Sequence, residues 1–223
     1  MCYVAGIMIL AGVFGGILFL LLLVGDWYQF TSLRPLAALY GFGIARRTQH
    51  LDNFTPETVI KRFGKQGTIE LPHGIARWFE DQEVITLRPY YQLFTMRFRT
   101  AWPLKGTIEL HSTDTGVELH LTKRTPWSSS IITMAWLALV IIGTAAFLIM
   151  FGIDGGFGTA GGLLMALGVA GLGVLVLLFG LIMISLAYRL EDSRLMQVYQ
   201  ELQDVFVKKN EKASSSSKET ASE

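Results

Sequence analysis

The sequence predicts an α+β membrane protein in which three transmembrane helices carry a small antiparallel β-rich cytoplasmic domain, inserted between helices 1 and 2. Residues 3–24, 130–151 and 161–187 contain no Asp, Glu, Lys, Arg or His. Each of these runs is long enough to cross a bilayer, which takes about 20 apolar residues in a helix. The residues between the first and second runs have instead the mixed composition of a soluble domain.

The chain divides accordingly into five parts. Residues 1–26 are expected to form transmembrane helix 1, 27–129 a cytoplasmic β-rich domain with one short helix, and 130–187 a transmembrane hairpin. Residues 188–212 are expected to form a cytoplasmic amphipathic helix. Residues 213–223 include a run of serines without apolar pattern, which is typical of a disordered tail.

Basic residues near the ends of the spans predict the orientation, because short loops rich in Lys and Arg stay in the cytoplasm. Arg46 and Arg47 follow the first span and Arg189 follows the third, whereas the loop between the second and third spans has only Asp154. We therefore expect a multi-pass protein of a bacterial inner membrane, with its N-terminus outside and its inserted domain and C-terminus in the cytoplasm. The first run lacks a basic n-region and is longer than the apolar h-region of a signal peptide, so it is expected to be a membrane anchor.

Composition excludes several classes of function. The formal net charge is +1 and no dense basic stripe occurs, so no nucleic-acid partner is predicted. The spans carry few polar side chains beyond Thr133, Thr144 and Ser185, which argues against a transport pathway. The single cysteine, Cys2, excludes an intramolecular disulfide. No phosphate-binding loop, dinucleotide fingerprint or nucleophile elbow is present, so no cofactor or catalytic residue is predicted.

Small residues recur at helical spacing within the spans. Gly12 and Gly16 form a GxxxG pair, and Gly162, Ala166 and Ala170 repeat every four residues. Such surfaces let helices approach closely in lipid. They either pack the three spans against one another or bind a membrane-protein partner.

Residues 27–53 have the character of a membrane interface, with several aromatic side chains after the first span. Pro35 is expected to start a short amphipathic helix that presents Leu36, Leu39 and Phe42. A second short helix is predicted from Pro56, with Thr55 as its N-cap.

Six short segments rich in aromatic and β-branched residues follow, separated by Gly and Pro, and predict an antiparallel sheet. The predicted strands are 68–71, 75–79, 83–87, 91–98, 106–112 and 117–122. In the last hairpin, a loop at 113–116 places Leu110 opposite Leu119 and Ile108 opposite Leu121.

The opposite face of this hairpin gathers two carboxylates and two imidazoles. These residues are Glu109, His111, Glu118 and His120. Imidazole nitrogen and carboxylate oxygen are suitable ligands for Zn or Fe, so a metal site is one interpretation. The other is a solvent-exposed set of cross-strand His and Glu pairs.

Basic side chains close to the spans are candidates to face lipid or bind an anion, since anionic headgroups attract cations at the cytoplasmic surface. These residues are Arg34, Arg97, Arg99, Lys123 and Arg124.

After the third span, Leu195, Val198, Leu202 and Val205 recur at steps of three and four, which predicts an amphipathic helix. Its apolar stripe is expected to pack on the β-domain of the same chain or, alternatively, on a partner.

The segments 98–99, 103–108 and 116–119, followed by Pro126-Trp127 leading directly into a span, resemble a pattern in uncharacterised bacterial integral membrane proteins. Those proteins place a small pleckstrin-homology-like β-domain beside their transmembrane helices. The resemblance covers about 35 residues and implies a scaffolding, assembly or lipid-proximal role without catalytic residues. This chain departs from the pattern by inserting the domain between the first and second spans.

Three hypotheses follow. The first is a non-enzymatic accessory, scaffold or assembly subunit of a larger membrane complex. The second is a lipid-proximal binding module. The third is a membrane-embedded metalloenzyme that uses the His and Glu face of the 106–122 hairpin.

Overall fold

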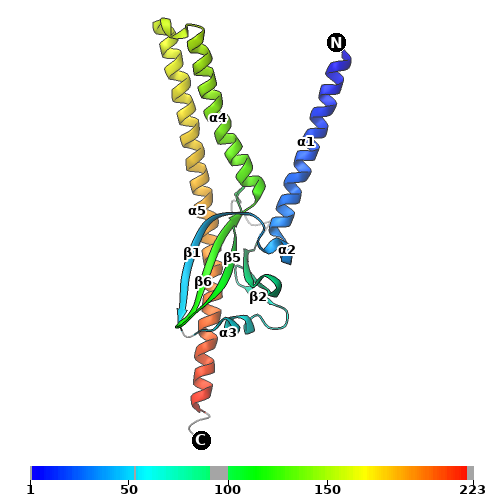
Figure 1. Cartoon of the computed structure of the whole chain (residues 1–223), viewed down its shortest axis with the longest axis vertical. Helices are drawn as coiled ribbons and strands as arrows, with labels where there is room; N and C mark the ends of the chain where they lie inside the picture. Colours follow the sequence, from blue (N-terminus) through cyan, green and yellow to red (C-terminus); the bar gives the residue numbers. More distant parts are fainter. Residues whose placement is uncertain (1, 53, 91–99, 220–223) are drawn as a thin grey trace.

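The computed structural model describes residues 2–52, 54–90 and 100–219 (Figure 1). Its helices are α1 (Cys2–Thr31), α2 (Pro35–Ala38), α3 (Pro56–Lys61), α4 (Trp127–Ile153) and α5 (Ala160–Glu219). Its strands are β1 (Phe42–Asp52), β2 (Thr68–Leu71), β3 (Gly74–Phe79), β4 (Val84–Pro89), β5 (Lys105–Thr113) and β6 (Gly116–Thr125). The predicted strand at 91–98 lies outside the described residues.

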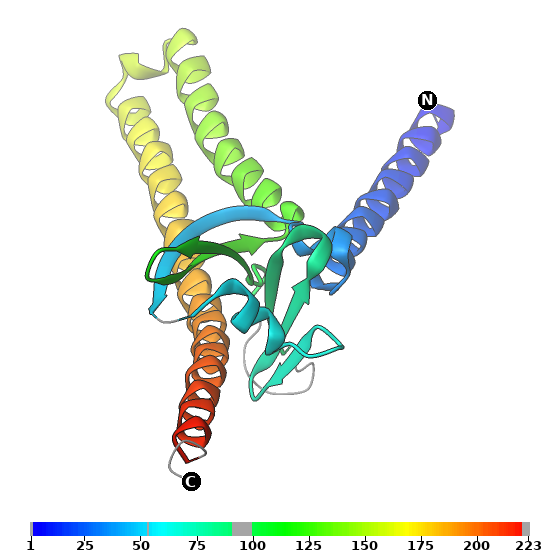
Figure 2. The same ribbon diagram turned by 60° about the horizontal axis from the view of Figure 1, so that its bottom comes forward.

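Three helices are long and apolar enough to cross a membrane, in agreement with the sequence. In Figures 1 and 2, α4 and α5 form a hairpin, whereas α1 diverges from it. The N-terminus and the turn between α4 and α5 lie at one end of the molecule, and the sheet and the C-terminus lie toward the other. The apolar helices therefore point to one side of the β-domain.

The hairpin of α4 and α5 is closed by small residues that recur every seven positions along α5. Gly173 lies against Thr144, with only 2.6 Å between a Cβ added to the glycine and the Thr144 Oγ1 atom, and Gly180 lies under the Trp136 ring. Ala166 and Ala187 are buried at the same spacing. A seven-residue repeat keeps one face of a helix on its neighbour.

This spacing differs from the predicted four-residue repeat of Gly162, Ala166 and Ala170. Gly162 lies in the first turn of α5 against the Gly156 carbonyl rather than against another span. Ala170 is only half-buried. The difference arises because the contact with α4 persists over several turns, and only a repeat near seven stays on one face of a long helix.

The six strands of the described residues form one antiparallel sheet in the order β1-β6-β5-β4-β3-β2. The predicted hairpin register is confirmed, since Leu110 pairs with Leu119 and Ile108 with Leu121. The short helix with its Thr55 N-cap is also present as α3, where the Thr55 hydroxyl accepts a hydrogen bond from the Thr58 amide at 3.3 Å.

The prediction for residues 27–53 was wrong in part. The interfacial helix is limited to the four residues of α2, and Phe42 begins β1, an edge strand that pairs with β6 over its whole length. Gly41, at φ +115°, makes the turn between them, a conformation that favours glycine. Helix α1 also continues beyond its apolar run to Thr31.

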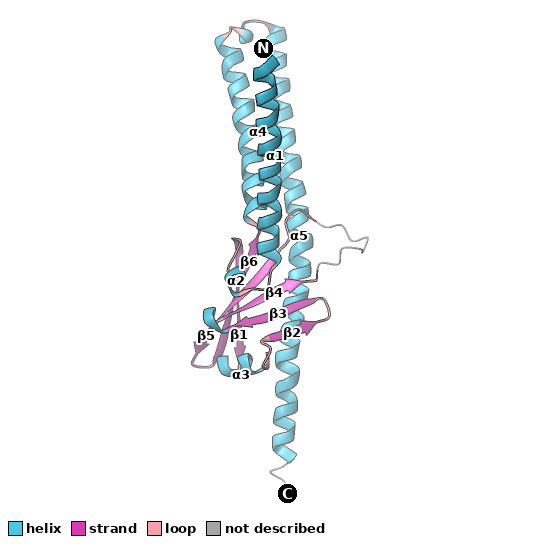
Figure 3. Ribbon diagram, turned by 90° about the vertical axis from the view of Figure 1, so that its right-hand side faces the viewer, coloured by secondary structure: helices cyan, strands magenta, loops and turns pink. Residues whose placement is uncertain are grey.

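Helix α5 covers one face of the sheet, as Figure 3 shows. Leu195, Val198 and Leu202 are fully buried there in a common core with Leu87 and Ile108, among others. The apolar stripe of the arm thus packs on the β-domain of its own chain, as the sequence favoured.

The third span and this arm form one uninterrupted helix. Residues 213–219, predicted to be a disordered tail, are also part of it, since α5 ends at Glu219. Neither Pro nor Gly occurs between Gly180 and Glu219, so nothing in the sequence breaks the helix where it changes from apolar to amphipathic.

Candidate functional site

The polar face of the sheet, opposite α5, meets the C-terminal end of α1, the short helix α2 and the N-terminal end of α4. We call this region the junction and define it by Asp26, Tyr40, Arg77, Arg88, Lys105, Arg124 and Ser128. Strand alternation places the basic residues of the junction on one face of the sheet. Along each strand, these residues alternate with residues that face the core, so their side chains lie on the other face; they are Arg77, Arg88, Lys105 and Arg124.

Lys105 lies at the centre of the junction and has no exposed surface. Its Nζ donates hydrogen bonds to the carbonyl oxygens of Ala37 at 2.6 Å and Phe30 at 3.4 Å. The same atom lies 4.8 Å from the centre of the Phe30 ring. Both carbonyls belong to the C-terminal turns of helices, which attract a cation. Burial, reinforced by the nearby charges of Arg124 and Arg88, lowers the pKa of Lys105 to about 7.

Three arginines from neighbouring strands bind the same stretch of chain. Arg77 donates from Nη1 to the Leu33 carbonyl at 3.0 Å, and Arg88 donates from Nη1 to the Thr31 carbonyl. Arg124 donates to the Gly41 carbonyl at 3.2 Å. Strands β3, β4, β5 and β6 therefore each contribute one cation that holds residues 30–41 by their backbone.

Asp26 connects Tyr40, which belongs to residues 30–41, with Ser128 at the start of α4. One of its carboxylate oxygens, Oδ2, accepts hydrogen bonds from the backbone amide of Ser128 at 3.0 Å and from the Ser128 hydroxyl. The other, Oδ1, accepts from the Tyr40 hydroxyl. Ser128 lies in the first turn of α4, where backbone amides lack partners within the helix. Burial and the Asp26 carboxylate raise the pKa of Tyr40 to about 12.

Sequence reasoning missed Asp26, Tyr40, Arg77, Arg88 and Lys105. One signal was present for Asp26, the first charged residue after an apolar run. The basic residues are separated by many positions in the sequence, and only the strand register of the folded sheet brings them together. Of the predicted lipid or anion candidates that the structure describes, Arg34, Lys123 and Arg124, only Arg124 belongs to the junction as defined above.

Lys123, another of those candidates, was predicted wrongly. Its side chain is largely buried on the α5 side of the sheet, where its Nζ forms an ion pair with Asp192. Strand alternation explains this, because Lys123 shares a face with Leu121 and Arg124 has the opposite one. Nearby, the buried Glu191 accepts hydrogen bonds from Thr100 Oγ1 at 3.1 Å and from Arg194 Nη1 at 2.8 Å.

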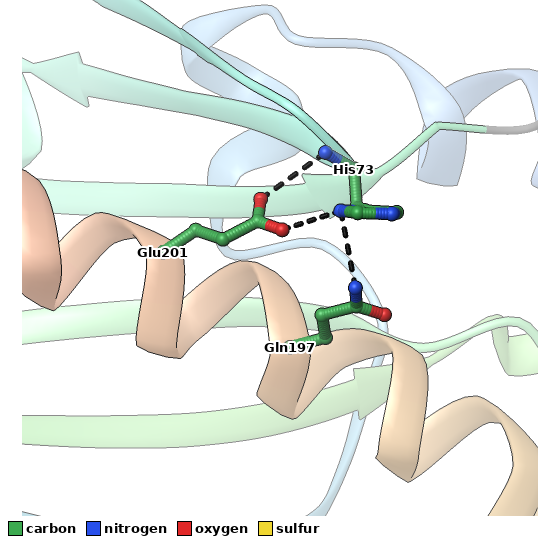
Figure 4. A network of polar contacts seen from close by, with 3 residues as sticks. All are labelled: His73, Gln197 and Glu201. Atoms are coloured by element: carbon green, nitrogen blue, oxygen red, sulfur yellow. Dashed lines mark hydrogen bonds and ion pairs between the residues drawn. The ribbon is translucent and has the colours of Figure 1, made fainter.

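The turn between β2 and β3 is also attached to α5 (Figure 4). The backbone amide of His73 donates to Glu201 Oε2 at 3.1 Å, and its Nδ1 atom contacts Glu201 Oε1. The Gln197 side chain lies 3.1 Å from the same ring nitrogen. These contacts add a polar attachment to the apolar packing of the arm.

The candidate metal face is arranged as two separate pairs. His120 Nε2 lies 3.1 Å from Glu118 Oε2, and His111 Nε2 lies 3.8 Å from Glu109 Oε2. The two imidazole rings are 4.5 Å apart, and all four side chains are at least 39% exposed. Within the described residues, no three His, Cys, Asp or Glu side chains converge as metal ligands would.

The remaining candidates lie apart from these groups. A Cβ atom added to Gly12 or Gly16 would meet no atom within 4 Å. Arg34 is exposed and donates from Nη2 to the Tyr28 hydroxyl at 3.2 Å. Arg97 and Arg99 lie outside the described residues.

Comparisons of the chain with protein-family models, curated proteins and solved structures found no match. The expected similarity to bacterial membrane proteins with a pleckstrin-homology-like domain stays a prediction. The junction and the three apolar helices are therefore the features that bear on function.

Proposed function

We propose that the protein is a non-enzymatic accessory or scaffold subunit of a larger complex in a bacterial inner membrane. In this complex, α1 binds a transmembrane helix of a larger partner. The β-domain and the C-terminal helix lie on the cytoplasmic side in this proposal. The junction fixes the base of α1, and the membrane-spanning part of α1 is the binding surface.

The observation that carries this proposal is the open surface of α1. Every residue of this helix from Leu10 to Leu22 is exposed, and Gly12, Gly15 and Gly16 have no atom of another element near them. A helix that presents glycines on an open surface is suited to close packing against a second helix. Because the base of α1 is held by Asp26 and Lys105, binding would require little reordering of the chain.

The α4–α5 hairpin supports the proposal because its glycines, unlike those of α1, are covered by side chains of a neighbouring helix. Its glycines at 173 and 180 are already covered by Thr144 and Trp136. The chain thus has one set of small residues that packs its own helices and a second set, on α1, that meets no described residue. The second set is the one that remains for a partner.

Replacing Gly12 and Gly16 with Leu tests the proposal. Because nothing lies near either glycine, the double variant is expected to keep the thermal stability of the purified protein and to lose its partner during purification in mild detergent. Mass spectrometry of the co-purified proteins gives the readout. A matched double variant, Gly173→Leu with Gly180→Leu, is expected to lower stability because it displaces Thr144 and Trp136.

The proposal fails if the unaltered protein purifies alone. It also fails if the Gly12→Leu and Gly16→Leu variant keeps the same partners. The metalloenzyme hypothesis is tested separately by metal analysis of the purified protein, and absence of stoichiometric Zn or Fe decides against it.

A further inference from the structure

We propose that Arg34 and Arg77 bind the phosphate of an anionic phospholipid at the base of α1. This inference rests on insertion of the three apolar helices into a bilayer. It does not rest on a partner of α1, so the two proposals fail independently.

Arg34 and Arg77 lie near the end of α1 that leaves the bilayer in this proposal. The linker of residues 32–34 follows α1 directly, and Asp26 is the only charged residue of α1. The end of a membrane-spanning helix lies at the level of the lipid headgroups. Arg34 is part of this linker, and Arg77 reaches it from β3 by its hydrogen bond to the Leu33 carbonyl. Both guanidinium groups are thus held beside one short segment at headgroup depth.

The positive charge around Arg34 and Arg77 also favours an anion. The described acceptors of Arg34 and Arg77 are a tyrosine hydroxyl and a backbone carbonyl, and neither residue forms an ion pair with a described carboxylate. The described hydrogen bonds of the Lys105 ammonium go to the carbonyls of Phe30 and Ala37. Asp26, the carboxylate nearest to Arg34 along the chain, already accepts hydrogen bonds from Tyr40 and Ser128. The region therefore carries positive charge that an anion would balance.

The lowered pKa of Lys105 agrees with this. Burial is its main cause, and the charges of Arg124 and Arg88 add to it. The part of this shift that comes from Arg124 and Arg88 indicates that positive charge predominates on this face of the sheet, and such a surface attracts an anion.

The guanidinium group itself is suited to bind phosphate. Arginine presents several N–H donors in a planar fork that matches phosphate oxygens. Arg77 uses Nη1 for the Leu33 carbonyl and stacks over the Phe79 ring, with 5.2 Å between its Cζ atom and the ring centre. These contacts orient the group and leave other N–H donors for a ligand.

The surroundings of Arg34 favour a lipid over a free phosphate. Tyr28 precedes Arg34 by six residues and Leu36 follows it by two, and their side chains are 60% and 85% exposed. Exposed apolar side chains at this depth are suited to contact acyl chains and the glycerol region. A soluble anion would gain nothing from them, so the surroundings favour a phospholipid.

Native mass spectrometry of the full chain tests the inference. The protein is extracted from vesicles of phosphatidylglycerol and phosphatidylcholine in equal amounts, and the retained lipids are counted. Phosphatidylglycerol is expected to be retained preferentially. Replacing Arg34 and Arg77 with Gln is expected to reduce this preference about fivefold for each arginine removed, since a basic residue near an anionic surface contributes about 1 kcal/mol.

The matched control is Lys61→Gln with Lys65→Gln, which removes the same charge at the end of the sheet remote from the spans (Figure 1). This variant is expected to keep the preference for phosphatidylglycerol. If it loses the preference to the same extent as the arginine variant, net charge alone explains the binding and the inference is overturned.

Two further measurements complete the test. Arg34→Gln alone is measured because Arg34 is exposed and the described contacts of its side chain are with Tyr28, so this change leaves the fold intact even if Arg77→Gln lowers stability. Unchanged lipid retention by Arg34→Gln overturns the inference. Inorganic phosphate at millimolar concentration is then added to the unaltered protein. Retention of phosphatidylglycerol is expected, and its displacement would instead identify a site for a free anion.

Discussion

A lysine buried among backbone carbonyls lacks a full negative charge to offset its own, and Lys105 is in this situation. Its Nζ bonds to the carbonyls of Phe30 and Ala37, which carry only the partial charges of helix ends. The charged form is therefore costly, as the pKa of about 7 indicates. An exposed lysine would remain charged far above neutral pH.

This pKa predicts a dependence of stability on pH. Between about pH 7 and the ordinary lysine value of 10.5, the unfolded chain binds a proton at Lys105 that the folded chain does not. Stability therefore rises with pH in this window, by at most about 1.4 kcal/mol per pH unit. Below pH 7 both states are protonated and this contribution is constant.

Thermal unfolding in mild detergent, compared between the unaltered protein and Lys105→Met, measures the effect. The difference in stability between the two proteins is expected to change in favour of the unaltered protein as pH rises from 7 to 10. A pH-independent difference would show that Lys105 keeps an ordinary pKa in the folded state.

At the scale of single elements, prediction succeeded where a pattern is local. Alternation placed the β5–β6 hairpin in its register, Thr55 and Pro56 located α3, and the stripe of Leu195 and Leu202 located the docked face of α5. Each of these signals lies within a few turns or one hairpin. They could be interpreted without knowledge of the rest of the fold.

Strand β1 was not predicted because its residues lack a local pattern that is typical of a strand. Only Leu51 among its residues is buried, so it lacks the alternation of a strand with one face in a core. Its conformation is set by pairing with β6, from Phe42 opposite Thr125 to Asp52 opposite Gly116. The junction was not predicted for the same reason, since Arg77 and Arg124 are brought to one face of one sheet only by the order and register of the strands.

The docking of α5 on the sheet makes a prediction at this scale. Leu202 is fully buried in the shared core, so Leu202→Ala is expected to lower the free energy of unfolding by about 2 to 5 kcal/mol. Asp204, two positions further on the same helix, is exposed, and Asp204→Ala is expected to change it by less than about 0.5 kcal/mol. Denaturant unfolding in detergent compares the two. Equal effects would mean that the arm does not pack on the sheet in solution.

The whole molecule combines a fixed base with separate apolar helices. The cations of the junction attach the end of α1 to the sheet, and Asp26 joins α1 to α4. The Lys123–Asp192 ion pair and the His73–Glu201 contact attach α5 to the sheet. Above this base, α1 diverges from the α4–α5 hairpin (Figure 2). Such an arrangement holds the three apolar helices in a defined position relative to one β-domain and leaves the described surface of α1 open, as the proposed scaffold requires.

If all three helices cross the bilayer, the N-terminus and the turn at Asp154 lie on one side and the β-domain on the other. Cys2 is the only cysteine, so it reports the first position directly. Asp154→Cys and Lys65→Cys, each combined with Cys2→Ser, report the others, and both replaced side chains are exposed. A membrane-impermeant maleimide applied to right-side-out vesicles is expected to label positions 2 and 154, and in inverted vesicles to label position 65. Labelling of position 65 alone in right-side-out vesicles would reverse the orientation, and labelling of positions 2 and 154 from opposite sides would show that one helix does not cross.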